Sequence, residues 1–256
     1  MRILYLANNR LGLEVLRWLK NRGENIVGLV LHPPQKQKYA KEIKQIAKLA
    51  SRLVLDGSKL HTSRSQNTLR EMNADVAISV LFDYILKPDF LALFPKGVLN
   101  LHPALLPYNR GQYPNVWSIV ENTPAGTTLH YIDAGIDTGA ILAQKKVLME
   151  PVDTGKTLYQ KLEKASLDLF KESWPRFIRG KLKAKTQKNK KGTYHRTLDV
   201  NKIDLIDLNK KYKAGDLINI LRARTFEPYP GAYFISKGKR VYLSLALNYD
   251  PKGRRS

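Results

Sequence analysis

Short aliphatic runs alternate with helix-forming stretches from the first residues to about residue 180. Residues 2–7, 26–31 and 75–81 are almost continuously apolar, which is typical of strands buried on both faces of a parallel sheet. The first two runs flank a helical stripe of apolar residues over 13–19, and such a strand–helix–strand unit has a right-handed connection. The alternation therefore predicts an α/β domain with a doubly wound, mostly parallel sheet.

The character of the chain changes after residue 180. The lysine-rich stretch 181–192 is typical of a linker or loop. Beyond it, a helix is predicted near residues 215–224, and two apolar runs surround a Gly-containing turn at 236–239, which indicates a hairpin. We expect three parts: a domain over 1–180, a basic linker over 181–192 and a small C-terminal α+β subdomain over 193–256.

The composition excludes some kinds of site and leaves one question about partners. The chain has no cysteine, which excludes disulfides, thiolate zinc sites and cysteine nucleophiles. Its net charge of +22 can attract polyanions, including nucleic acid. The alternative is a solvated lysine-rich surface, which we favour because the dense lysine run has no interleaved aromatic residue on which bases could stack. No apolar run approaches membrane-spanning length and none resembles a signal peptide, so we expect a cytoplasmic protein.

Asn100 and His102 stand two residues apart at the end of the apolar run 97–101. If this run is a strand, both side chains lie on the same face. An amide can hold a developing oxyanion, and an imidazole can donate to it or move a proton. Asp137, in a glycine-interrupted loop, could orient His102 and raise the pKa of its ring. Taken singly, the three residues have simpler interpretations: a capping Asn, a turn His and an Asp that forms an Asx-turn.

The sequence Asn-Leu-His-Pro-Ala-Leu-Leu-Pro at residues 100–107 is followed by Arg110-Gly111 and later by Asp-Ala-Gly-Ile-Asp-Thr-Gly at 133–139. This two-part pattern resembles the folate-dependent formyltransferase family, and most of all its sugar N-formyltransferases. The resemblance covers about residues 1–180 and continues more weakly over 222–232. It implies transfer of a formyl group from 10-formyltetrahydrofolate, as co-substrate, to an amine, without a metal. Asn100 and His102 would hold the oxyanion, and Asp137 would help to remove the amine proton.

The resemblance also implies binding residues. It assigns the pterin ring to one loop and to the backbone of the later motif: Phe82, Asp83, Tyr84, Ile85, Leu86, Asp133 and Gly135. The alternative for the loop over 82–86 is simple packing on the core. Substrate contacts are predicted for five residues: Arg110, Tyr194, His195, Arg222 and Tyr229. An arginine fork fits a diphosphate and a tyrosine can stack on a base. The alternatives are a salt bridge for Arg110 and packing between helix and hairpin for Arg222 and Tyr229.

Three functions follow from these observations. The first is formylation of a nucleotide-linked amino sugar for glycan assembly. The second is methionyl-tRNA formylation, which the positive charge favours. Against it, about 60–75 residues remain after the core, too few for the usual β-barrel. The third is a non-catalytic module that binds folate or a polyanion. Glycinamide ribonucleotide formylation is disfavoured because the first turn, residues 8–12, lacks a glycine-rich phosphate cradle.

Two further expectations complete the analysis. The predicted hairpin could pair across a two-fold axis, which would make the protein a homodimer. His32, His61 and His130 have no metal-ligand spacing and are interpreted as structural or surface residues.

Overall fold

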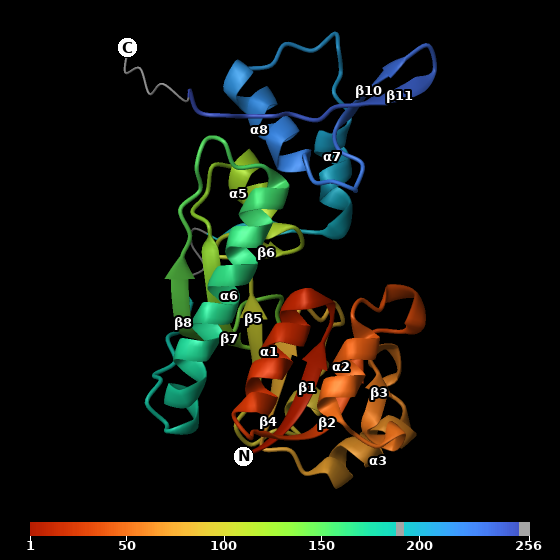
Figure 1. Cartoon of the computed structure of the whole chain (residues 1–256), viewed down its shortest axis with the longest axis vertical. Coiled ribbons are helices and arrows are strands. Elements are labelled where there is room, and N and C mark those ends of the chain that lie inside the picture. Colours follow the sequence, from red (N-terminus) through yellow and green to blue (C-terminus); the bar gives the residue numbers. More distant parts are fainter. Residues whose placement is uncertain (188–191, 251–256) are drawn as a thin grey trace.

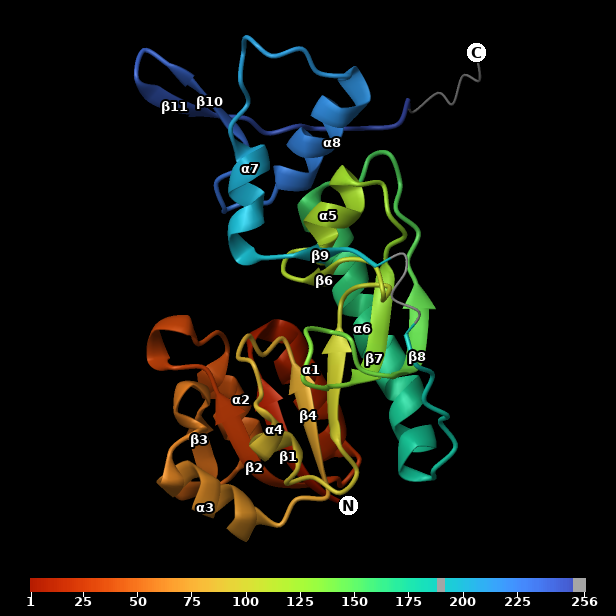
Figure 2. The ribbon, with the colours of Figure 1, turned by 180° about the vertical axis from the view of Figure 1, so that it is seen from behind.

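The centre of the molecule is a seven-stranded sheet with the order β3-β2-β1-β4-β5-β7-β8 (Figures 1 and 2). This computed structural model describes residues 1–187 and 192–250. Strands β1 to β5 pair in parallel, and β7 and β8 join the β5 edge antiparallel. The prediction of a mostly parallel sheet is confirmed. The strands of the sheet are β1 (Arg2–Ala7), β2 (Asn25–Leu31), β3 (Val54–Asp56), β4 (Val76–Val80), β5 (Val98–His102), β7 (Gly126–Tyr131) and β8 (Ile141–Lys146).

Helices cover both faces of this sheet, because successive side chains of its central strands point to opposite sides. In β1, Ile3 and Tyr5 belong to one core cluster, whereas Leu4 and Leu6 belong to the other. The first face is covered by α1 (Asn9–Asn21), α2 (Ala40–Ala47) and α6 (Gly155–Ile178). The second face is covered by α3 (Ser63–Met72) and α4 (Pro88–Leu91). The sheet is therefore doubly wound, as predicted.

The start of α1 differs from the sequence-based expectation. We predicted a turn over residues 8–12, but the helix begins at Asn9. Asn8 takes the extended conformation of a cap residue, and its side chain bonds the loop that follows β2. The remaining short helices before β5 are η1 (Pro34–Lys36), η2 (Ser51–Leu53) and η3 (Gly57–Lys59).

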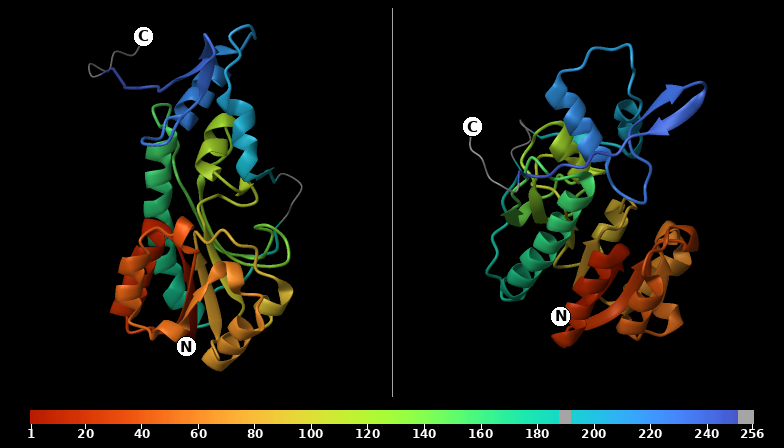
Figure 3. Two further views of the ribbon diagram at one scale, coloured as in Figure 1. Left: turned by 90° about the vertical axis from the view of Figure 1, so that its right-hand side faces the viewer. Right: turned by 45° about the horizontal axis from the view of Figure 1, so that its top comes forward.

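The C-terminal elements gather at one end of the molecule, beyond the carboxyl end of β5 (Figure 3). They are η5 (Thr197–Val200), α7 (Asn201–Asp204), α8 (Ala214–Arg224) and the antiparallel hairpin of β10 (Tyr233–Ser236) and β11 (Lys239–Tyr242). The predicted hairpin is confirmed. A third core cluster joins this end to the sheet domain, with buried residues from α5 (Pro114–Val120), α6 and α8.

The stretch predicted to be a linker is partly attached to the sheet domain. Lys185 and Ile141 exchange backbone hydrogen bonds of 2.8 Å, so the chain returns to β8 after α6. Further on, β9 (Tyr194–His195) pairs in parallel with β6 (Arg110–Gly111). Residues 188–191 of the linker and 251–256 of the C-terminal subdomain lie outside the described residues. The division into three parts stays a prediction.

In the part of the chain that the structure describes, no helix combines the length and the apolar character needed to cross a membrane.

Candidate active site

Asn100 and His102 both lie on β5 and line the same cavity, as the strand spacing predicts. Strand β5 is held between the parallel β4 and the antiparallel β7. The pairing with β7 places His130 directly opposite Asn100. The carboxyl end of β5 therefore presents an amide and an imidazole at the point where the sheet changes from parallel to antiparallel pairing.

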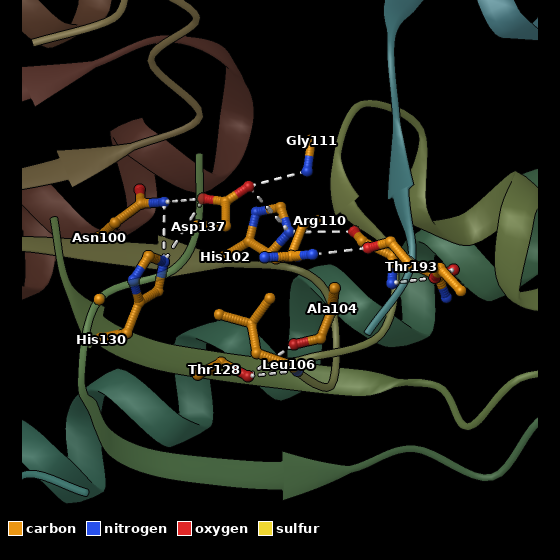
Figure 4. A network of polar contacts seen from close by, with 12 residues as sticks. Asn100, His102, Ala104, Leu106, Arg110, Gly111, Thr128, His130, Asp137 and Thr193 are labelled. Atoms are coloured by element: carbon orange, nitrogen blue, oxygen red, sulfur yellow. Dashed lines mark hydrogen bonds and ion pairs between the residues drawn. The ribbon is translucent and has the colours of Figure 1, made fainter. Parts of the chain in front are cut away.

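Asp137 joins these two side chains from the loop after β7 (Figure 4). Its Oδ1 accepts a hydrogen bond of 3.3 Å from Asn100 Nδ2. Its Oδ2 lies 3.6 Å from His102 Nε2 and accepts a hydrogen bond of 2.8 Å from the backbone N–H of Gly111. The structure thus brings together the three residues predicted to be catalytic.

His130 is a fourth member of this cluster, and the sequence-based interpretation of it as a structural or surface residue missed this position. It is fully buried, and its Nε2 lies 3.2 Å from Asn100 Nδ2 and 3.5 Å from Asp137 Oδ1. Its Nδ1 lies 2.7 Å from the carbonyl oxygen of Tyr131, which can only accept. We therefore assign the proton to Nδ1, which leaves Nε2 to accept from the Asn100 amide. Only the register between β5 and β7 reveals this contact.

The electrostatics of the cluster favour a carboxylate beside a neutral imidazole. Burial alone would raise the pKa of Asp137, but His102 and the Gly111 N–H hold it well below its ordinary value. Burial lowers the pKa of His102, and this outweighs the opposite effect of Asp137. Asp137 thus raises the pKa of His102, as expected, but desolvation of the imidazolium is the larger effect and the net pKa is lowered.

The tautomer of His102 follows from its surroundings. Its Nε2 faces two acceptors, Asp137 Oδ2 at 3.6 Å and the carbonyl oxygen of Asn109 at 3.4 Å. A hydrogen on Nε2 satisfies both, so we assign the lone pair of the neutral ring to Nδ1. Such a ring can accept a proton, and the neighbouring carboxylate would stabilise the imidazolium that forms.

The cluster opens into a cavity of about 770 Å³. Every residue predicted to bind the pterin lines this cavity: Phe82, Asp83, Tyr84, Ile85, Leu86, Asp133 and Gly135. His32, interpreted from the sequence as structural or surface, is buried beside the loop over 82–86. Its Nε2 accepts from the Asp83 N–H at 3.1 Å, and its ring packs 5.1 Å from Phe82 and 5.4 Å from Tyr84. His32 therefore shapes this loop.

Asp133 determines the shape of the loop that carries Asp137. Its Oδ1 accepts from the Gly135 N–H at 3.1 Å and from Thr138 Oγ1 at 2.6 Å. Such contacts are typical of an Asx-turn. Asp133 therefore forms the Asx-turn that the sequence offered as the simpler interpretation of Asp137. The carboxylate of Asp137 instead contacts Asn100 and His102.

Two of the five predicted substrate residues, Tyr194 and His195, line the cavity. Their strand β9 pairs with β6, which places them beside the Gly111 that holds Asp137. The His195 ring stacks on Trp117 with centroids 4.0 Å apart and planes 7° apart. Its Nε2 lies 3.2 Å from Glu121 Oε1, at an angle too poor for a hydrogen bond.

The other three predicted substrate residues do not line the cavity. Arg110 Nε donates to the carbonyl oxygen of Thr193 at 3.4 Å, which ties β6 to the returning chain. Arg222 is buried, and its Nη1 donates to three carbonyl oxygens between α8 and the loop before α6, those of Glu150, Pro151 and Asp153. The guanidinium of Arg222 is thus engaged with backbone, and it joins α8 to the loop before α6 rather than to the hairpin that the sequence-based alternative named.

Tyr229 lies near the cavity but outside its lining. Its hydroxyl accepts a hydrogen bond of 3.0 Å from Lys38 Nζ, and Lys38 does line the cavity. The Tyr229 ring also packs edge-on against Phe226, with centroids 5.5 Å apart. Tyr229 therefore acts on the cavity through Lys38.

Metal-ligating side chains do not gather in residues 1–187 and 192–250, where no group of three or more His, Asp or Glu could hold an ion.

Comparison with known proteins identifies the family. The model for the formyl transferase family matches residues 1–173, and the model for the N-formyltransferase dimerization C-terminal domain matches residues 199–249. The chain belongs to the formyl transferase family. This formyl transferase is therefore an enzyme, and the alternative of a non-catalytic binding module is set aside.

Individual relatives support the family and leave its substrate open. A methionyl-tRNA formyltransferase from Chloroflexus aurantiacus is 29% identical over 247 residues, which cover 93% of this chain and 77% of that protein. The crystal structure of a 4-N formyltransferase from Francisella tularensis is 26% identical with a TM-score of 0.82, and the match covers 97% of this chain and 98% of that one. The formyltransferase PseJ from Anoxybacillus kamchatkensis, solved with UDP-4,6-dideoxy-4-formamido-L-AltNAc and tetrahydrofolate, is 31% identical with a TM-score of 0.57, covering 79% and 89%.

Proposed function

We propose that this enzyme transfers the formyl group of 10-formyltetrahydrofolate to the amino group of a nucleotide-linked amino sugar. The observation that carries the proposal is one continuous cavity. It extends from the loop over 82–86, past Asn100, His102 and Asp137, to the segment 194–197. The likeness to the 4-N formyltransferase over nearly all of both chains supports the same function.

The loop over 82–86 has the features that a flat heterocycle requires. Its residues line the cavity, and the Asp83 N–H is directed to His32. Among the described residues, the other backbone groups of this loop make no hydrogen bond to backbone elsewhere. They can therefore pair with the polar edge of a pterin, while Ile132 and Ile136 of the later loop supply apolar surface. When bound, the folate would supply an activated formyl carbon.

The residues of the cluster then divide the chemistry of acyl transfer to an amine. Attack on the formyl carbon puts negative charge on its oxygen. Both hydrogens of the Asn100 amide are engaged here, with His130 and Asp137, so Asn100 can donate to that oxygen when it exchanges one of these contacts for it. The lone pair on His102 Nδ1 can take the proton that the amine loses. Asp137 keeps the ring in this tautomer and stabilises its charged form. His130 orients the Asn100 amide through the 3.2 Å contact.

The far end of the cavity supports a nucleotide-linked substrate. Tyr194 exposes an aromatic ring there and Arg196 adds positive charge, and Lys38 is a second cation on the lining of the cavity. An aromatic face can stack on a base, and cations can pair with a diphosphate. We also propose a cytoplasmic location. We further propose a homodimer, which the match to a dimerization C-terminal domain supports.

Methionyl-tRNA formylation is the second candidate, because the sequence relatives carry that name and the net charge is +22. The discriminating experiment offers 10-formyltetrahydrofolate with UDP- and dTDP-linked 4-amino-4,6-dideoxyhexoses and, separately, with methionyl-tRNA. We expect a product 28 Da heavier from an amino sugar, detected by mass spectrometry. Formylation of methionyl-tRNA without any sugar product would overturn the proposal.

A further inference from the structure

The chain returns to the catalytic loop after α6, and this return places a side chain where the sequence predicted a linker. Residues 181–187 run back along the sheet, and Lys185 pairs with Ile141 at the start of β8. Two residues later, Gln187 is buried, with 8% of its surface exposed. A buried amide in a lysine-rich stretch requires hydrogen-bond partners to offset its desolvation.

Those partners are backbone groups of the catalytic loop. Gln187 Nε2 donates to the carbonyl oxygen of Asp137 at 2.8 Å and to that of Gly139 at 2.8 Å. Both hydrogens of one amide nitrogen are thereby used on two carbonyls that bracket Thr138. We propose that Gln187 is a positioning residue that holds the Asp137 loop in the geometry needed for formyl transfer. This inference rests on the role proposed above for Asp137.

The backbone conformation of Asp137 explains why the loop needs the two hydrogen bonds from Gln187. Its φ of 51° lies in the left-handed region, which costs an Asp more than an extended conformation does. At Gly139 a Cβ atom would overlap the carbonyl oxygen of Tyr131, so the loop is pressed against β7. The side chain of Asp137 is held by Asn100 and Gly111, and its own carbonyl by Gln187.

The test compares Gln187→Leu, which keeps the volume but removes both donors, with Gln66→Leu. Gln66 is a matched control because it is equally buried, with 9% exposed, and its Nε2 donates to the carbonyl oxygen of Leu60 at 2.8 Å, away from the cavity. For Gln187→Leu we expect kcat to fall on the order of a hundred-fold, as small misplacements of catalytic groups do. Asp133, Gly135 and Ile136 of the same loop line the cavity, so the dissociation constant for 5-formyltetrahydrofolate should rise too, but by a smaller factor than kcat falls. Gln66→Leu should change neither quantity.

A readout independent of turnover is hydrogen exchange at the Gly111 amide, because that N–H donates to the Asp137 carboxylate. In Gln187→Leu this amide should exchange on the order of ten-fold faster, whereas Gln66→Leu should leave it unchanged. Wild-type exchange and wild-type kcat in Gln187→Leu would overturn the inference.

A second variant, Gln187→Glu, gives a signature in pH. A carboxylate at this place faces two carbonyl oxygens and repels them, whereas the protonated acid can donate to one. The activity of Gln187→Glu relative to wild type should therefore rise as the pH is lowered, and a flat ratio would contradict the role. Asp137→Asn is measured in parallel. If Asp137→Asn keeps full activity, the catalytic proposal fails; if it is inactive while Gln187→Leu is fully active, only the role of Gln187 fails.

Discussion

At the residue scale, one carboxylate organises the site. Asp137 accepts from the amide of Asn100 and the backbone N–H of Gly111 and faces the protonated Nε2 of His102, and each of these contacts favours its ionised form. The pKa of Asp137 is held well below its ordinary value. In the proposed mechanism Asp137 therefore stays ionised, and His102 takes up the proton that the amine loses.

Replacement of the cluster residues should separate chemistry from folate binding. Asn100→Ala removes the donor to the developing oxyanion and should lower kcat on the order of a hundred- to a thousand-fold. His102→Ala and Asp137→Ala should have losses at least as large. All three should bind 5-formyltetrahydrofolate within a few-fold of wild type by calorimetry. The surface variant His61→Ala is the control. Near-normal turnover in the three cluster variants would remove the catalytic assignment.

The pKa of His102 should be lower in the folded protein than in an exposed histidine. Burial lowers its pKa below the ordinary 6.5, and Asp137 partly opposes this. An NMR titration of the His102 ring should give a midpoint below 6.5 in the wild type, and a still lower one in Asp137→Asn. Because the unfolded chain binds this proton first, the contribution of His102 to the free energy of unfolding should fall as the pH drops below 6.5. A midpoint above that value would contradict the assignment of a neutral ring.

At the scale of elements, very short strands decide where distant residues meet. The two-residue strands β6 and β9 pair Arg110 with Tyr194 and Gly111 with His195. Gly111 has a φ of +86°, and a Cβ there would overlap the carbonyl oxygen of His195. The close pairing that brings β9 to the cavity therefore depends on glycine at this position.

A variant of Arg222 can show whether this residue joins two elements of the fold or binds the substrate. Its guanidinium joins α8 to the loop before α6 through the carbonyl oxygens of Glu150, Pro151 and Asp153. Hydrogen bonds to charged groups contribute about 1.5–3 kcal/mol each, so Arg222→Leu should lower the free energy of unfolding by about 3 kcal/mol in urea titrations. The exposed Arg17, paired with Glu14, is the control, and Arg17→Leu should cost less than about 1 kcal/mol. In Arg222→Leu that remains folded, KM for the sugar should be unchanged; a large rise in KM would restore a substrate role.

At the scale of the whole molecule, the C-terminal end presents apolar surface that other parts of the structure leave uncovered. Ile235 and Tyr242 are exposed on one face of the hairpin and Val241 on the other, because paired residues share a face and successive residues alternate. They belong to the segment that matches the dimerization C-terminal domain. An exposed apolar surface of this kind is typical of an interface.

A homodimer through this surface makes a prediction about mass in solution. Wild-type protein should sediment at twice the mass of one chain, and Val241→Lys should shift it toward the mass of one chain. Ile178→Lys is the matched control, because Ile178 is similarly exposed but is the last residue of α6 and does not belong to the hairpin. A wild-type monomer, or a Val241→Lys dimer as tight as wild type, would contradict the hairpin interface.

How much of this could be read from the sequence depends on the range of the interactions. The alternation of apolar runs and helical stripes predicted the doubly wound sheet, because burial on both faces of a strand is a local pattern. The spacing of Asn100 and His102 predicted their shared face for the same reason. The motif around Asp137 added the third member of the cluster through its resemblance to a family.

The remaining parts of the site required the tertiary structure. His130 meets Asn100 through the register of an antiparallel pair, and Gln187 reaches Asp137 because the chain returns after a 24-residue helix. An arginine such as Arg222 could bind a phosphate group, yet its guanidinium donates to backbone carbonyls of a loop distant in sequence. Periodicity along the chain determines which face a side chain takes, whereas the partner that it meets depends on which segments pack together, and no local pattern records that.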